Sequence, residues 1–345
     1  MTTIGTVYDI FVYQNQINEN ATNKSNSNVA QVSKNIETEL NLSSHQKIGK
    51  IFMCFSVYTN TRQLFNTDVL SNNLSIFHGF KFLIMCGVII GHTYSLIAES
   101  LDNKVWMIKQ SEEHIYFAIF IIYLALDIYY FSSGYLMIYS YYSFKTNKKQ
   151  IKPTGCREKL IELIFLIIMR YIRLTPAYMM VLGIVQLVST WLDNTSQFYM
   201  YAKDHEVCGT YWWTNLLYIN NFLPVDAMCV PWSWYLANDM QYYIITVALL
   251  ILSTTYFYTA VMTLVVILIG SIILNGYISY IYEISNMKIY ENSKELLYIF
   301  YYAPWMRIYP YLIGVITNYI LTNSKNYLYA NWVLYYFYFY LWLIQ

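Results

Sequence analysis

The feature that most constrains this 345-residue chain is a series of long apolar blocks. A helix needs roughly 20 apolar residues to cross about 30 Å of hydrocarbon, and most of the blocks approach that length. A backbone inside lipid must satisfy its own hydrogen bonds, so each block is expected to be helical. The sequence therefore predicts an all-α, multipass transmembrane helical bundle with about seven spans. The blocks cover residues 80–97, 115–142, 174–192, 234–255, 258–276, 308–322 and 330–345.

Composition agrees with a chain whose main partner is the lipid bilayer. Hydrophobic residues make up 57% of the sequence and charged residues 12%, about half of their usual share in soluble domains. The net charge of +1 gives no indication of nucleic-acid binding. The five cysteines include no C-x-x-C pair and no metal-ligand spacing, so no metal is expected.

Loop charge predicts the orientation of the spans. Residues 145–159 hold six basic residues and one acid, so this loop is expected in the cytoplasm. Residues 98–114 hold two basic residues and four acids, and should face the lumen or the exterior. Residues 1–75, which are rich in Asn and Ser, are then predicted to be a polar, flexible cytoplasmic segment. Residues 76–345 form the membrane domain, in either the endoplasmic reticulum or the plasma membrane.

One apolar stretch does not fit a simple count of spans. Residues 160–176 read LIELIFLIIMRYIRLTP, which is apolar, then doubly basic, then interrupted by Pro176. This pattern predicts an interfacial helix at 158–173 on the cytoplasmic leaflet. A new span is then expected to begin near Leu174.

Ionisable residues inside the apolar blocks are candidates for function, because such groups are costly in hydrocarbon. Lys81 and His92 lie eleven residues, or about 16 Å, apart on one helix. Taken alone, they indicate a snorkelling lysine and a histidine bonded to a neighbouring helix. Asp127 lies in the middle of a span, where it suits either a polar cavity or a structural hydrogen bond. Ser133 follows it, beside a glycine that permits close helix packing.

Arg170 and Arg173 are three residues apart and so share one face of a helix. Two guanidinium groups at a membrane surface suit a phosphate or pyrophosphate. The same spacing also suits an anchor that contacts lipid headgroups, and spacing alone favours the anchor slightly.

Five further residues stand near predicted membrane surfaces. Cys208 and Cys229 lie in a loop expected to face outward, where an oxidising compartment would let them form a structural disulfide. Asp239, Gln241 and Arg307 are polar residues at the ends of spans. Each of these three alone indicates no more than an interfacial anchor.

Taken in order, six stretches resemble nose-resistant-to-fluoxetine-type members of the acyltransferase 3 superfamily. The resemblance covers about residues 55–330, beginning with FSVYTNTRQLF. Each stretch alone is weakly diagnostic, and their order and spacing carry the resemblance. The six are FHGFKFLIMCGVIIGHTY, DIYYFSSGYL, RYIRLTPAY, CGTYWWTNLLYINNF, CVPWSWYLANDMQYYI and APWMRIYPYLIG.

The resemblance implies transfer of an acyl group, typically acetyl, from cytoplasmic acyl-CoA to an unknown hydroxyl acceptor. It implies that His92 is the catalytic residue and that Arg170 and Arg173 bind the donor. Lys81 stands where an arginine is usual, which removes a bidentate fork for phosphate. Asp127 and Ser133 match the family's D-x-F-F-x-x-S-G pattern, with Tyr130 in place of a phenylalanine.

Our hypothesis from these residues is that Lys81, Arg170 and Arg173 hold the CoA phosphates at the cytoplasmic mouth. His92 would act as a general base or carry the acyl group, and Asp127 would orient its imidazole. An alternative is a non-catalytic carrier of lipids or small hydrophobic molecules. Compared with the family members that it resembles, the chain looks truncated at both ends. An inactive fragment is therefore a third expectation.

Overall fold

The computed structural model describes residues 2–15, 49, 52–66, 75–100, 115–148, 155–196, 203–281 and 301–323. Throughout these ranges the regular structure is helical and no strand occurs, which confirms the all-α prediction for them. Contacts divide the chain into two units, Met1–Ser75 and Ile76–Gln345. Each unit is described by itself.

The first unit contains two helical stretches that pack together. Helix α1 (Thr2–Tyr8) continues into the π-helical turn η1 (Asp9–Tyr13), and α4 (Val57–Leu64) contacts both. The buried Asp9 carboxylate accepts hydrogen bonds from the hydroxyls of Ser56 and Thr59 and from Gln14 Nε2. One buried carboxylate is thus satisfied by donors from both stretches. The predicted flexibility of residues 1–75 as a whole stays a prediction.

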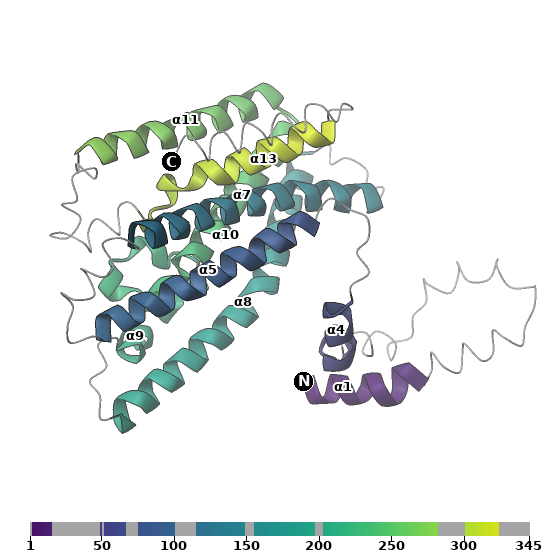
Figure 1. Ribbon diagram of the computed structural model, residues 1–345. Helices are drawn as coiled ribbons and strands as arrows, with labels where there is room; N and C mark the ends of the chain where they lie inside the picture. The colour runs from purple at the N-terminus through teal and green to yellow at the C-terminus, as the bar shows by residue number, and fades with distance from the viewer. Residues whose placement is uncertain are drawn as a thin grey trace, which may run out of the picture. The chain divides into compact units, whose positions relative to one another are not determined.

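The second unit is a helical bundle, shown in Figure 1. Its six longest described helices coincide with the first six predicted apolar blocks, except that the block at 234–255 extends two residues past the end of its helix. The block at 330–345 lies outside the described residues. Helix α9 (Asp204–Leu216) and three short 3₁₀ turns occupy the connection between α8 and α10. The six are α5 (Ser75–Ser100), α7 (Ile115–Lys148), α8 (Cys156–Thr195), α10 (Trp234–Ser253), α11 (Phe257–Ile281) and α13 (Ile308–Asn323).

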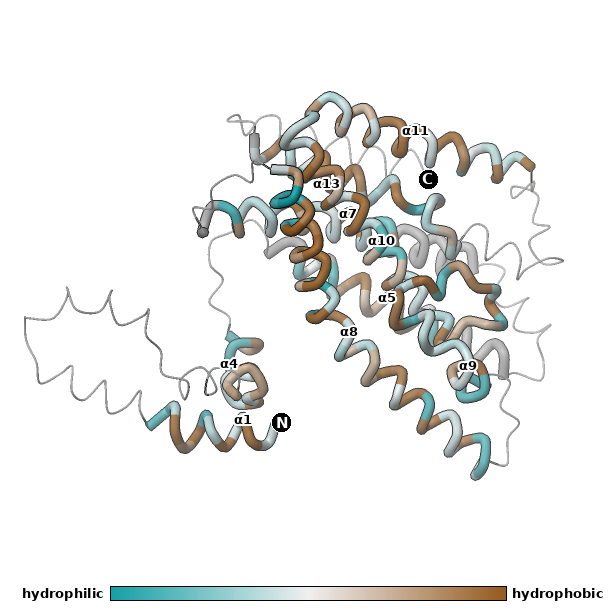
Figure 2. The backbone as a smooth tube through the Cα atoms, turned by 180° about the vertical axis from the view of Figure 1, so that it is seen from behind, coloured by the Kyte–Doolittle hydropathy of each residue, from teal (hydrophilic) through white to brown (hydrophobic). Residues whose placement is uncertain are grey.

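Two stretches of the described chain are long and apolar enough to cross a membrane. They are Pro231–Ser253 and Phe257–Ile281. Two shorter apolar helical stretches are Lys81–Thr93 and Ile308–Thr322. Large apolar side chains are also exposed along α8 and α11, among them Ile172, Leu187 and Val266. Figure 2 shows hydrophobic residues along the middle of α8. Exposed apolar surface of this extent is typical of a membrane or protein contact.

Helix α8 differs from the prediction of two separate segments. It runs without a break through Pro176, so the expected interfacial helix at 158–173 and the span after it form one helix of 40 residues. A proline inside a helix removes one backbone hydrogen bond and usually kinks or ends it. Here Tyr178 and Leu182, just after the proline, are buried against other elements, and this packing favours continuation of the helix.

The packing of α7 against α13 depends on two glycines. A Cβ atom on Gly134 would lie 2.2 Å from the backbone oxygen of Tyr311. A Cβ atom on Gly314 would lie 2.1 Å from the backbone oxygen of Phe131. Neither distance is possible for real side chains, so the two helices can approach this closely only with glycine at both places. The predicted role of Gly134 in close helix packing is therefore confirmed.

The core lies where α7, α10 and α13 meet. Three fully buried tyrosines, one from each helix, form its centre: the Tyr130 and Tyr242 rings are 5.3 Å apart, and the Tyr242 and Tyr311 rings 5.6 Å. The Tyr242 hydroxyl donates to the backbone oxygen of Pro304 at 2.7 Å. This core fixes the relative positions of α7, α10 and α13, which carry Asp127, Asp239 and the residues around them.

Candidate functional site

Asp127 is held by two residues from the start of α13. Arg307 Nη1 lies 3.0 Å from Asp127 Oδ1, and the Tyr309 hydroxyl donates to Asp127 Oδ2 at 3.1 Å. The guanidinium of Arg307 also lies 4.9 Å from the ring centroid of Tyr301. Both charged residues are largely enclosed: 5% of the Arg307 side chain and 17% of the Asp127 side chain are exposed. Each charge is therefore compensated inside the bundle.

Asp239 forms a second ion pair at a junction of three helices. Its Oδ2 pairs with Arg170 Nη2 from α8, and its Oδ1 accepts the Ser133 hydroxyl from α7 at 2.6 Å. The Arg170 guanidinium lies 4.2 Å from the ring centroid of Tyr243. Within the described residues, the buried Nε of Arg170 has no hydrogen-bond partner. One buried donor of this guanidinium is thus unused within the described residues.

Lys81 brings α5 to the same junction. Its Nζ lies 5.7 Å from the ring centroid of Tyr129 on α7. The charges of Asp239, Arg170 and Arg173 all act on it. We call Lys81, Arg170 and Arg173 the cationic cluster; with Asp239 as its single acid it keeps an excess of two positive charges. Arg173 lies one turn beyond Arg170, and its side chain is exposed.

The structure does not bring His92 and Asp127 together. His92 lies on α5 with an exposed side chain, and no hydrogen bond or ion pair joins it to Asp127, although both residues are described. The expectation that Asp127 orients the imidazole is therefore wrong for this conformation. The physical reason is competition: Arg307 is permanently charged and Tyr309 adds a donor, which together stabilise a carboxylate better than a neutral imidazole.

Gln241 and the two cysteines belong to a neighbouring layer that fastens the segment between α9 and α10. Gln241 Nε2 donates to the backbone oxygen of Tyr218 at 2.8 Å and to Asn221 Oδ1 at 2.9 Å. Cys208 and Cys229 are joined by a disulfide, with their Cα atoms 4.5 Å apart. These contacts are structural, and they hold the segment against the start of α10, where Asp239 stands.

Several partners in the site escaped the sequence analysis. Tyr309 and Tyr243 are two of the 39 tyrosines in the sequence, and nothing in their spacing distinguishes them from the others. Asn221 and Asn238 are both fully enclosed, and Asn221 Nδ2 donates to Asn238 Oδ1 at 2.7 Å. A pair of asparagines within apolar surroundings is a usable signal, because buried amides require partners. In the described ranges no three His, Cys, Asp or Glu side chains gather as a metal site requires.

Comparison with known proteins gives one informative similarity. No protein-family model matches the chain, and no solved structure matches it. The chain is 28% identical over 350 residues to "Nose resistant to fluoxetine protein 6" of Caenorhabditis elegans, across 93% of its own length. It spans 38% of that relative's length. The chain is therefore similar, along nearly all of its length, to a nose-resistant-to-fluoxetine protein, which supports the resemblance drawn from its motifs.

Proposed function

We propose that this chain is part of an integral membrane acyltransferase of the acyltransferase 3 superfamily. It transfers an acyl group, acetyl in the simplest case, from cytoplasmic acyl-CoA to a hydroxyl acceptor. Similarity to one nose-resistant-to-fluoxetine protein and the apolar helices support a membrane protein of this type. The chain covers 38% of that relative, so the activity of a whole protein is part of the proposal.

The observation that carries the proposal is the cationic cluster. Arg170 and Arg173 from α8 are near enough to Lys81 from α5 for their charges to act on it, although the two helices lie far apart in sequence. Their excess positive charge suits the phosphates of CoA, which carry several negative charges. Among the described groups, the buried Arg170 Nε lacks an acceptor, and a phosphate oxygen would supply one.

Asp239 serves this site as a positioning residue. It binds the Nη2 end of the Arg170 guanidinium, while Ser133 fixes its other oxygen. The planar guanidinium is thereby held by one edge, with Tyr243 stacked against its face. The Nε group keeps an unused donor, so in this proposal a phosphate that enters beside the guanidinium binds it without displacing the carboxylate.

His92 is the proposed catalytic residue, about three helical turns from Lys81. The CoA arm would extend from the cationic cluster along α5 towards it. His92 takes the proton of the acceptor hydroxyl as the oxygen attacks the thioester carbonyl, and an ester forms. The C–S bond breaks, and the CoA sulfur leaves and receives that proton. Asp127 has no direct part in this step; by holding Arg307 it joins α7 to α13.

The membrane arrangement is proposed from the sequence. We propose that seven segments cross the bilayer. They are α5, α7, the second half of α8, α10, α11, α13 and residues 330–345. The basic residues 145–159 face the cytoplasm in this arrangement, in the endoplasmic reticulum or the plasma membrane. Lys81 and the Arg170–Arg173 pair then lie on the cytoplasmic side, where acyl-CoA is available.

Photo-crosslinking of radiolabelled acetyl-CoA to the full chain in native membranes tests the proposal. We expect labelling that falls at least about tenfold in Arg170→Gln and Arg173→Gln, which remove charge-assisted hydrogen bonds. Arg157→Gln is the matched control, because Arg157 is an exposed arginine at the beginning of the same helix. His92→Ala should retain labelling and lose acyl transfer. Labelling independent of both arginines, with lipid uptake intact, would instead support the carrier.

A further inference from the structure

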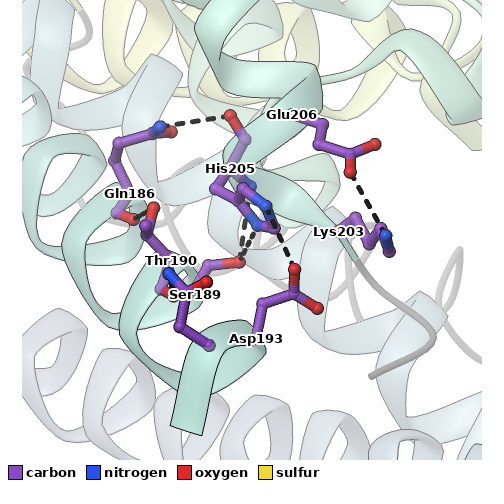
Figure 3. A network of polar contacts seen from close by, with 8 residues as sticks. Gln186, Ser189, Thr190, Asp193, Lys203, His205 and Glu206 are labelled. Atoms are coloured by element: carbon purple, nitrogen blue, oxygen red, sulfur yellow. Dashed lines mark hydrogen bonds and ion pairs between the residues drawn. The ribbon is translucent and has the colours of Figure 1, made fainter. Parts of the chain in front are cut away.

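Apart from the cationic cluster, a serine, a histidine and an aspartate meet where α8 ends and α9 begins. Ser189 Oγ lies 3.1 Å from His205 Nδ1, and His205 Nε2 lies 3.5 Å from Asp193 Oδ2. Figure 3 shows the imidazole ring of His205 with dashed lines to both Ser189 and Asp193. Ser189 and Asp193 are one helical turn apart on α8, and His205 is the second residue of α9. We call these three residues the serine–histidine cluster.

The hydrogen bonds around Ser189 determine where its proton points. The backbone N–H of His205 donates to Ser189 Oγ at 3.3 Å, so this oxygen already accepts one bond. Asp193 Oδ2 lies 3.5 Å from His205 Nε2, and a carboxylate can only accept a proton, so we assign the proton of the neutral ring to Nε2. In this tautomer Nδ1 accepts the hydroxyl proton of Ser189. The proton order is serine to histidine to aspartate, as a general base for a serine nucleophile requires.

Two acids and the beginning of a helix surround the serine–histidine cluster. Asp193 on α8 and Asp204 at the beginning of α9 are the acids near the ring. The Lys203 and Glu206 charges are joined to each other at 3.2 Å and largely cancel. Ser189 also contacts the first turn of α9, whose positive dipole end stabilises negative charge developing on its oxygen.

The cluster is partly open and keeps an unused polar atom beside it. The His205 side chain is 17% exposed and that of Asp193 is 32% exposed, so a reagent can approach from the surface. Gln186, one turn before Ser189, donates its Nε2 to the backbone oxygen of His205 at 3.1 Å. Its Oε1 is buried and has no hydrogen-bond partner within the described residues. That oxygen is free to accept a hydrogen bond from a bound molecule.

We propose that Ser189 is a nucleophile activated by His205 and that it takes acyl groups from carboxylic esters at the α8–α9 junction. Ser189 Oγ bonds to the ester carbonyl carbon while its proton moves to His205 Nδ1. The C–O bond to the alcohol breaks, and His205 returns the proton to that alcohol. Water then cleaves the Ser189 ester, so the net reaction converts an ester and water to an acid and an alcohol. Asp193 is a positioning residue in this step.

A fluorophosphonate probe tests the proposal on the full chain in lipid nanodiscs. The Ser189 oxygen would displace fluoride and form a bond to phosphorus, which peptide mass spectrometry locates. We expect labelling at Ser189, with a rate that rises with pH as catalysis by a general base requires. Ser189→Ala should abolish it, and His205→Gln should lower its rate on the order of 100-fold. Asp193→Asn should lower the rate by a smaller factor, because it removes the charge that stabilises the imidazolium formed in this step.

Controls separate an activated serine from a contact that merely joins two helices. Ser253→Ala removes a serine near the other end of the bundle, in α10, and should leave labelling unchanged. Retention of the Cys208–Cys229 disulfide reports whether each variant keeps α9 in place. If His205→Gln fails to fold, the pH profile of the unaltered chain decides. Absent labelling of Ser189, or a rate independent of pH between about 5 and 8, overturns the proposal.

Discussion

Arg307 and Asp127 are 180 positions apart in the sequence, yet Arg307 Nη1 lies 3.0 Å from Asp127 Oδ1. This pair joins the middle of α7 to the residue just before α13. Together with the close crossing at Gly134 and Gly314, it fixes one helix against the other. The pair therefore belongs to the scaffold of the candidate site, and two predictions follow from this role.

Removal of one member of the Asp127–Arg307 pair should destabilise the bundle by about 3–5 kcal/mol, because the other charge remains buried. Asp127→Ala and Arg307→Ala are the single changes, measured by thermal unfolding in detergent. The double replacement should cost less than the sum of the two single changes, since it leaves no unpaired charge. Strictly additive losses would show that the two residues act independently.

Gly134→Ala and Gly314→Ala should each separate α7 from α13. The added Cβ atoms would meet backbone oxygens at 2.2 and 2.1 Å, which rigid helices cannot relieve by rotating a side chain. Overpacking typically lowers the free energy of unfolding by about 1–3 kcal/mol. Because the clash here is with backbone atoms, we expect a loss of about 3 kcal/mol or more for each variant. Gly183→Ala on α8 and Gly270→Ala on α11 are matched controls, because nothing lies within 4 Å of a Cβ there. Equal thermal stability of all four variants would contradict the packing assigned to this crossing.

The sequence predicted the helices better than it predicted their partners. Hydrophobic blocks and the helical period locate helices, because burial depends on local pattern. The candidate charges were also visible, since ionisable residues stand out in apolar blocks. The sequence did not show which charged residues pair. Asp127 was expected to pair with His92, whereas its partners in the structure are Arg307 and Tyr309. Such pairing depends on helix rotation and depth, which a single sequence does not specify. Pro176 misled for a similar reason, since tertiary packing overrides a local breaker.

The disulfide gives a prediction on the segment between α8 and α10. Cys208 and Cys229 are 21 positions apart in the sequence. Because the disulfide restricts the unfolded chain, its loss should lower the free energy of unfolding by about 2–4 kcal/mol. Cys208→Ser with Cys229→Ser should lower the melting temperature and increase proteolysis between them. Cys156→Ser is the control, because Cys156 is a free, exposed cysteine. The control variant should match the unaltered chain in both measurements.

Asp239 should affect donor binding through Arg170. Asp239→Asn keeps the shape of the side chain but weakens the ion pair that holds one edge of the guanidinium. We expect weaker acetyl-CoA photolabelling, by about tenfold for a loss near 1.4 kcal/mol. Ser133→Ala removes one hydrogen bond to the same carboxylate and should have a smaller effect in the same direction. Stronger labelling in Asp239→Asn would show instead that the carboxylate competes with the donor for Arg170.

The first unit should lose stability in acid through Asp9. Burial tends to raise the pKa of this carboxyl, but hydrogen bonds from Ser56, Thr59 and Gln14 outweigh burial and lower the pKa below its ordinary value of 3.8. A carboxyl with a lowered pKa contributes stability that is fully present above the ordinary value. That contribution is lost as the pH falls through the lower, folded value. The protection of the α4 amides from hydrogen exchange, measured relative to unstructured amides at the same pH, should therefore fall below about pH 4 in the full chain. Asp9→Asn should lower this protection at neutral pH and make it respond little to acid. Protection in the unaltered chain that does not change between about pH 6 and 2.5 would contradict this role for Asp9.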